Sequence, residues 1–191
     1  MTDPEPPEQL MIQLATIMDT NTLIWSLVLF MILLLCSGFV SASEIAYFSL
    51  NPKDLEQLKK DKTPRGQMVL EWRDKPKELL SIILIVNNFI NVGIVILGAV
   101  ITKDVSLRFF TPELLESPVW IFVFQVVIIT LILLLFGELI PKLYAHKNAL
   151  SIALKMATPL RIMSKTPPFS WLSSVLMKST ELINKRTKKL D

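Results

Sequence analysis

The sequence predicts an all-α integral membrane protein with three transmembrane helices and short amphipathic juxtamembrane helices. Of its 191 residues, 51% are hydrophobic, which is more than a soluble domain of this size usually contains. The apolar residues form three long runs without strand-like alternation, and Lys and Arg residues avoid these runs. Together these observations argue against an ordinary soluble fold and indicate a multi-pass membrane protein.

The three apolar runs cover residues 23–40, 79–101 and 119–140. Runs of roughly 18 to 23 residues give helices of about 27 to 35 Å, close to the thickness of the hydrocarbon core of a bilayer. The first helix is expected to continue through the more polar stretch SASEIAYFSL, so the first span covers about 23–50. Residues 23–165 are expected to form one transmembrane domain.

The distribution of Lys and Arg predicts the orientation of the chain. None precedes the first span, eight lie between the first and second, two between the second and third, and ten after the third. Because positively charged loops stay on the cytoplasmic side, we expect residues 1–22 outside the plasma membrane, and the loop 51–78 and the C-terminal part inside. Without a positively charged start, the first span is expected to be a retained helix rather than a signal peptide.

The segments outside the spans contain helix-start and helix-break signals. Asn-Pro at 51–52 favours a helix start, and Thr-Pro at 63–64 breaks the apolar pattern, so the loop is expected to hold two short amphipathic helices. A further break at Thr-Pro-Pro, 166–168, predicts that 166–191 form a cytoplasmic amphipathic linker helix. These basic segments face anionic lipid, so the net charge of +3 requires no nucleic-acid partner.

Polar and ionisable side chains interrupt each predicted span. The candidate metal ligands are Ser41, Ser43, Asn87, Asn91, Gly137 and Glu138, with Asn88 and Glu44 as secondary candidates. Asn87 and Asn91 are four residues apart, so both amides lie on one face of a helix. Pro141 breaks the helix because it cannot donate to the carbonyl four residues earlier, that of Gly137. A backbone oxygen is thereby freed beside the Glu138 carboxylate.

The expected depths of the candidate ligands in the membrane predict that ligands from the three spans lie close together. At 1.5 Å per residue, Ser41 lies roughly 27 Å and Glu138 roughly 28 Å from the outer ends of their helices, and Asn87 lies about 12 Å above its inner end. All three are therefore expected in the inner half of the membrane. Hydroxyl, amide, backbone and carboxylate oxygens suit hard cations such as Mg²⁺, Ca²⁺ or Na⁺ rather than zinc, copper or iron.

Two other interpretations of these residues remain open. The serines and asparagines can join helices by hydrogen bonds while Glu138 is a solvated helix end, although intramembrane acids usually mark an ion path. An intramembrane enzyme needs an activated nucleophile, and the sequence places neither His nor Lys beside a serine at this depth, so no enzymatic activity is expected. The lone Cys36 has no partner for a disulfide.

The stretches SASEIAYFSLNP, NNFINV and GELIPKLYAHKNA resemble the signature segments of the CorC/CorB family of magnesium transporters, which is related to the animal cyclin M (CNNM) proteins. The resemblance covers nearly the whole chain, with the three motifs in order. It implies a homodimer that exports Mg²⁺, the transported ion, coupled to entry of Na⁺. It also implies a dehydrated Mg²⁺ in an inward-facing cavity, ligated from the serine, asparagine and Gly137-Glu138 motifs.

Family members usually continue into a cytosolic pair of CBS domains, and these 191 residues are expected to cover the transmembrane part alone. We therefore expect the linker 166–191 to lead towards such a domain in the same protein. The partners expected are a second copy of the chain, membrane lipid and that CBS pair. The second copy is expected because three helices alone offer too little surface to shield a polar site from lipid. The alternative function is a membrane scaffold or Mg²⁺ sensor of the same family that does not transport.

Overall fold

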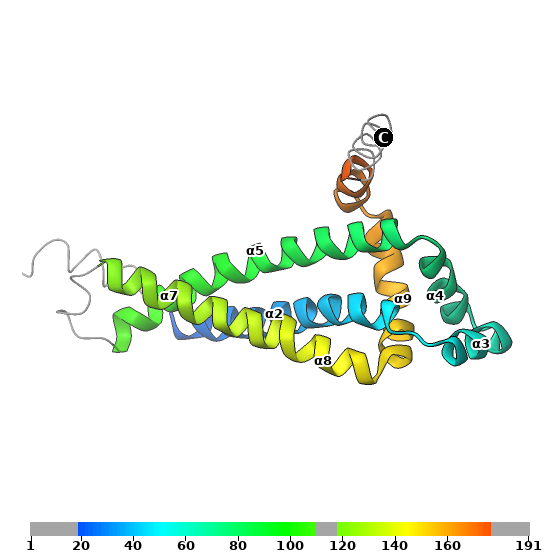
Figure 1. Ribbon diagram of the computed structural model, residues 1–191. Helices are drawn as coiled ribbons and strands as arrows, with labels where there is room; N and C mark the ends of the chain where they lie inside the picture. The colour runs from blue at the N-terminus through cyan, green and yellow to red at the C-terminus, as the bar shows by residue number, and fades with distance from the viewer. Residues whose placement is uncertain (1–18, 110–117, 177–191) are drawn as a thin grey trace, which may run out of the picture.

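The computed structural model describes residues 19–109 and 118–176, and these residues fold into helices without a strand (Figure 1). The helices are α2 (Thr20–Phe48), α3 (Pro52–Asp61), α4 (Pro64–Asp74), α5 (Pro76–Phe109), α7 (Pro118–Ile132), the π-helix η1 (Leu133–Leu139), α8 (Ile140–Lys147) and α9 (Ala149–Lys165). Residues 169–176 form a further helical segment. Expectations for residues 1–18 and for the linker beyond 176 lie outside the described residues.

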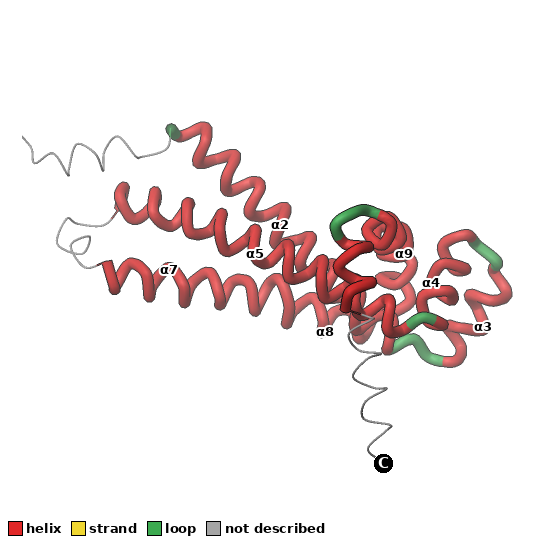
Figure 2. Tube along the Cα trace, turned by 90° about the horizontal axis from the view of Figure 1, so that it is seen from above, coloured by secondary structure: helices red, strands yellow, loops and turns green. Residues whose placement is uncertain are grey.

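Within the described part of the chain, three helices are long and apolar enough to cross a membrane. They cover Thr20–Phe48, Pro76–Ser106 and Gln125–Lys147, and they run alongside one another (Figure 2). Large apolar side chains on all three face outward, among them Trp25, Ile96 and Phe136, as hydrocarbon surroundings require. The predicted all-α membrane fold is therefore confirmed.

The third span extends further than the sequence predicts. The apolar pattern places its end at residue 140, before Pro141, but the chain passes from α7 through η1 into α8 and stays helical to Lys147. Pro141 lies in the first turn of α8, directly after η1, so the helix continues although Pro141 has no N–H to donate. A continuous third helix therefore carries both Glu138 and Lys142.

The loop after the first span forms the two short helices that its sequence predicts. Asn51 accepts a hydrogen bond from the N–H of Asp54 at 2.9 Å, and the Asp54 carboxylate accepts one from the N–H of Asn51 at 3.0 Å. This capping box starts α3. Thr63 caps α4 by accepting a bond from the N–H of Gly66 at 3.1 Å, so the chain restarts its helix where Thr-Pro breaks it.

We define the base of the bundle as α3, α4, α9 and the adjoining ends of α2 and α5 (Figures 1 and 2). Its helices pack together and are joined by hydrogen bonds and an ion pair. The buried Tyr47 hydroxyl of α2 donates to the carbonyl of Ala153 in α9 at 3.2 Å. Arg73 of α4 donates to the carbonyl of Tyr47 at 3.1 Å, and Arg161 of α9 pairs with Glu71 of α4 at 2.7 Å. The base therefore holds the ends of the spans in a fixed register.

Gly38 allows α2 to approach the third span closely. A Cβ atom on Gly38 would lie 3.0 Å from Cγ of Pro141 and 3.2 Å from the backbone oxygen of Phe136. The backbone oxygen cannot move aside as a side chain can. A Cβ on Gly93 of α5 would meet only Cδ1 of Leu33, at 3.6 Å, an ordinary contact.

These contacts predict opposite results for two glycine substitutions. Gly38→Ala is expected to destabilise the fold by about 1–3 kcal/mol, because the added methyl group overpacks a backbone contact. Gly93→Ala is expected to leave stability unchanged or raise it by up to about 1 kcal/mol, since alanine favours helix. Thermal unfolding of both variants in detergent measures the difference, and equal melting temperatures would contradict the close approach at Gly38.

Candidate ion-binding site

Four buried or half-buried polar side chains join α2 to α5. The Ser37 hydroxyl lies 2.7 Å from Oδ1 of Asn91 and 3.2 Å from Oδ1 of Asn87. The Ser41 hydroxyl donates to Oδ1 of Asn87 at 3.1 Å. We call these four residues the serine–asparagine cluster. Both serines are 1% exposed, so the cluster lies inside the helix pair rather than on its lipid face.

Regular helix geometry brings the four side chains together. Ser37 and Ser41 are one turn apart on α2, as are Asn87 and Asn91 on α5, so each pair occupies one face of its helix. The two faces pack against each other, and Ser37 reaches both amides. Each hydroxyl directs its proton to an amide oxygen, so every member of the cluster has a hydrogen-bond partner.

Gly137 of η1 covers the cluster from the third span. Gly137 is buried, and a Cβ atom built on it would lie 3.2 Å from Oγ of Ser37 and 3.0 Å from Cδ1 of Leu133. A side chain at this position would therefore press on the Ser37 hydroxyl. The backbone of Gly137 comes within reach of the cluster because the residue has no side chain.

The π-helix changes which carbonyl loses its hydrogen-bond donor. In η1 the bonds span five residues, as from the N–H of Ile140 to the carbonyl of Leu135. The same spacing pairs Pro141, which has no N–H, with the carbonyl of Phe136. This carbonyl is one residue earlier than the α-helical count from Pro141 to Gly137 predicts, and it lies beside Gly38.

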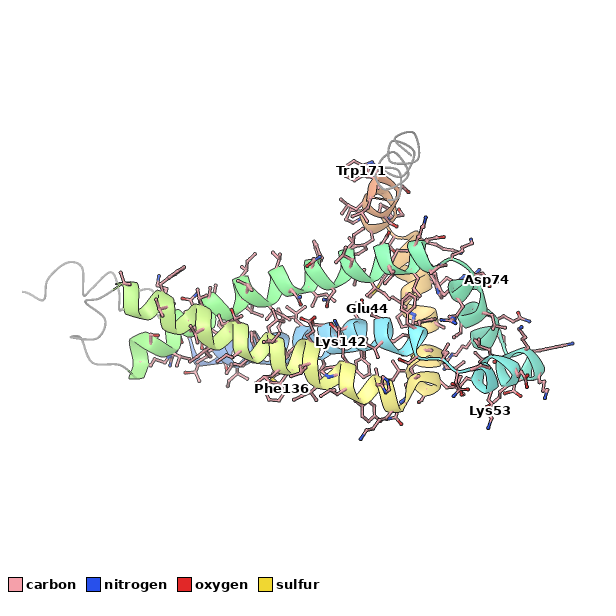
Figure 3. All side chains as sticks on the ribbon, in the orientation of Figure 1. Glu44, Lys53, Asp74, Phe136, Lys142 and Trp171 are labelled. Carbon is pink, nitrogen blue, oxygen red and sulfur yellow. The ribbon has the colours of Figure 1, made fainter. Side chains whose placement is uncertain are left out.

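A second group of side chains, the carboxylate–lysine cluster, connects α2 to η1 and α8. Nζ of Lys142 lies 2.9 Å from Oε1 of Glu138 and 3.3 Å from Oε2 of Glu44. Figure 3 shows Glu44 and Lys142 near each other. The side chains are 45% exposed for Glu138, 39% for Glu44 and 29% for Lys142. With both carboxylates ionised, the cluster carries one net negative charge.

The structure brings some of the sequence-predicted site residues together and separates others. Ser41, Asn87, Asn91 and Gly137 meet in or beside the serine–asparagine cluster. Glu44 and Glu138 meet at Lys142. Within the described residues, no hydrogen bond joins the Glu138 carboxylate to the serines or asparagines.

Two predicted residues lie apart from both clusters. The Ser43 hydroxyl is fully buried and donates to the carbonyl of Val40, on its own helix, at 2.6 Å. Asn88 is exposed, and its side chain makes no hydrogen bond in the part of the chain that the structure describes. Of the two motif serines, Ser41 is therefore the one whose hydroxyl reaches α5.

Sequence reasoning missed two residues of this region, Ser37 and Lys142. Ser37 lies one helical turn before Ser41 in LLLCSGFVSASE, so the i,i+4 spacing that links the asparagines would have identified it. Lys142 lies four residues after Glu138. An end of the span at Pro141 would place this lysine in the tail, whereas the continuous helix returns it to the side of Glu138.

The arrangement offers oxygen atoms to a ligand. Among residues 19–109 and 118–176, no group of three or more His, Cys, Asp or Glu side chains is placed to hold a metal ion. Hydroxyl, amide, backbone and carboxylate oxygens are the ligands of hard cations. The oxygen donors of the two clusters are therefore of the type that hard cations prefer as ligands.

Comparison with known proteins identifies the family of this chain. The family described as the cyclin M transmembrane N-terminal domain matches residues 28–189. A UPF0053 protein of Synechocystis sp. is 32% identical over 143 residues, which cover 74% of this chain and 38% of that protein. A UPF0053 protein of Haemophilus influenzae is 28% identical over 155 residues, covering 79% of this chain and 34% of that protein.

The chain thus spans between about one third and two fifths of the length of these relatives. The family match includes every residue of the serine–asparagine and carboxylate–lysine clusters and most of the three apolar spans. With the matched region covering most of the sequence, this multi-pass membrane protein belongs to the cyclin M transmembrane (CNNM) family.

Proposed function

We propose that this chain is the membrane part of a magnesium transporter that carries Mg²⁺ through its three spans. The observation that carries the proposal is the serine–asparagine cluster, where buried and half-buried oxygen atoms of two apolar helices meet next to Gly137 of the third span. Membership of the cyclin M transmembrane family supports the same function. The nearby carboxylates supply negative charge that a divalent cation requires.

The ligands we propose are the side-chain oxygens of Ser41, Asn87 and Asn91, the carbonyl of Gly137 and the Glu138 carboxylate. Ser37 joins this set because its hydroxyl bonds to both asparagines. A cation entering the cluster exchanges these hydrogen bonds for ligation, at a net cost of about 0.5–1.5 kcal/mol for each bond. Ligation by charged and polar oxygens offsets this cost, and the hydrogen bonds form again when the cation leaves.

The proposed direction is export from the cytosol, with Na⁺ entry as the driving reaction. The eight Lys and Arg residues in the loop after the first span support a cytoplasmic base, and the half-exposed carboxylates near that base support access from the cytosol. Mg²⁺ is strongly hydrated and demanding in its geometry. Na⁺ accepts similar oxygen ligands with half the charge, so it is suited to replacing Mg²⁺ during release.

We also propose that the protein is a homodimer in the plasma membrane, joined through its linker to a cytosolic CBS pair. In one copy of the chain, Asn88 is exposed and Glu44 and Glu138 are partly exposed on apolar spans. Bare contact between such groups and hydrocarbon is expensive. A second copy, or a water-filled cavity between two copies, would shield them, and mass measurement in detergent tests this assembly.

The transport proposal is tested by binding and flux measured on the same preparation. We expect Mg²⁺ to raise the melting temperature of the purified chain, because a ligand bound to the native state stabilises it. We also expect Mg²⁺ flux in liposomes that reverses when the Na⁺ gradient is reversed. Flux indifferent to Na⁺ would exclude coupling, binding without flux would favour the sensor or scaffold, and absence of binding would exclude both.

A further inference from the structure

We propose that Lys142 is an internal competitor of the transported cation: its ammonium group holds the carboxylate oxygens that the cation needs, and it thereby limits affinity and promotes release. This inference rests on the proposed transport function and assigns a role to a residue outside the proposed ligand set. It follows from the carboxylate–lysine cluster, in which one ammonium group contacts two carboxylates from different helices.

The geometry makes Lys142 and a divalent cation alternatives for the same oxygen. Nζ of Lys142 lies 2.9 Å from Oε1 of Glu138, a charge-assisted hydrogen bond. Glu138 precedes Lys142 by four residues on a continuous helix, the favourable order for such a pair. A cation that takes Oε1 as a ligand must displace the ammonium group or share the oxygen with it, and sharing brings two positive charges together.

The second carboxylate keeps the ammonium group near the site when it is displaced. Oε2 of Glu44 lies 3.3 Å from Nζ on the opposite side of the helix contact, on α2. Lys142 can therefore give up Glu138 and remain paired with Glu44. The lysine side chain is 29% exposed, so water screens its charge less completely than it would on an open surface.

The net charge of the carboxylate–lysine cluster predicts how removal of Lys142 changes Mg²⁺ affinity. With Lys142 present the cluster has one net negative charge, and without it two, because Glu44 and Glu138 are the only acids that the lysine contacts among the described residues. The attraction felt by a divalent cation is proportional to this charge. Removing the ammonium group should therefore tighten Mg²⁺ binding, whereas a purely structural ion pair would give unchanged or weaker binding.

Release of the cation is the second step that Lys142 would affect. Without Lys142, departure of the cation would leave the carboxylates of Glu44 and Glu138, on two packed helices, without a counter-charge. Two such charges in surroundings of low polarity are unfavourable. The ammonium group restores a hydrogen-bonded pair at once. A chain without this group should hold its ion longer, so a lower half-saturating Mg²⁺ concentration should accompany a lower maximal rate.

The test compares Lys142→Met with Lys147→Met in the full chain. Lys147 is the matched control, since it lies five residues further along α8, is exposed, and makes no ion pair within the described residues. Mg²⁺ affinity is read from the Mg²⁺-dependent rise in melting temperature. Lys142→Met is expected to bind at least tenfold more tightly, about 1.4 kcal/mol, and Lys147→Met and Lys142→Arg to bind as wild type.

A second neutral variant and two outcomes decide whether Lys142 competes with the cation. If Lys142→Met does not give monodisperse protein, Lys142→Gln replaces it, because the amide still donates to carboxylates without a charge. Wild type that binds Mg²⁺ together with a neutral Lys142 variant of equal or weaker affinity would overturn the inference alone. Wild type that Mg²⁺ does not stabilise would overturn the proposed function and the inference with it.

Discussion

Glu138→Gln is expected to abolish most of the Mg²⁺-dependent rise in melting temperature, with affinity reduced at least tenfold, about 1.4 kcal/mol. Glutamine keeps the shape of the side chain and one oxygen acceptor but removes the negative charge. The carboxylate–lysine cluster then holds only Glu44 and Lys142, whose charges cancel. A divalent cation would face neutral oxygens in surroundings of low polarity, where charge-assisted contacts are the strong ones.

The fold itself should survive this substitution. The Glu138 side chain is 45% exposed and pairs with the i,i+4 lysine on its own continuous helix, so the pair contributes little to stability. Glutamine can still accept a hydrogen bond from Lys142. The melting temperature without Mg²⁺ should therefore remain close to that of wild type, and the loss should appear only when Mg²⁺ is added.

Glu56→Gln is the matched control, because Glu56 is an exposed glutamate of α3 in the base. It removes the same charge from the same chain without touching either cluster. Both variants are compared with wild type by thermal unfolding over a series of Mg²⁺ concentrations. A dimeric, monodisperse Glu138→Gln variant that Mg²⁺ stabilises as strongly as wild type would show that Glu138 is a solvated helix end.

Most of the fold was predictable because it depends on local signals. The apolar runs fix three helices long enough to span a bilayer, and the caps at Asn51 and Thr63 fix the two short helices. The π-helix was not predictable, since one extra residue in a turn depends on how the third span packs against α2. The close approach of Gly38 to Phe136 and Pro141 belongs to that packing.

In the candidate site, too, the parts that depend on local spacing were predictable and the parts that depend on helix packing were not. The i,i+4 spacing of Asn87 and Asn91 and the depth of Ser41 predicted that these groups meet, and the structure brings them together. The partner of Glu44 depends on the rotation of α2 relative to α8, which no local pattern specifies. Only the packed helices reveal that Glu44 and Glu138 share one ammonium group.

Asn87→Ala is expected to lower both Mg²⁺ affinity and stability, whereas Asn88→Ala should change neither. Asn87 accepts hydrogen bonds from Ser37 and Ser41, so its removal leaves two buried hydroxyl groups without that acceptor and costs about 1–3 kcal/mol. Ser37 keeps Asn91 as a partner, and Ser41 can turn to its own helix backbone as Ser43 does. The stability loss should therefore fall at the lower end of this range.

The effect on binding should be the larger one, because the amide oxygen of Asn87 is a proposed ligand that alanine cannot replace. We expect at least a tenfold loss of Mg²⁺ affinity, about 1.4 kcal/mol, measured by Mg²⁺-dependent thermal stabilisation. Asn88 is the control one residue away, with the same side chain on the exposed side of α5. If Asn87→Ala loses stability but keeps its Mg²⁺ response, the serine–asparagine cluster only joins helices, and the ion binds elsewhere.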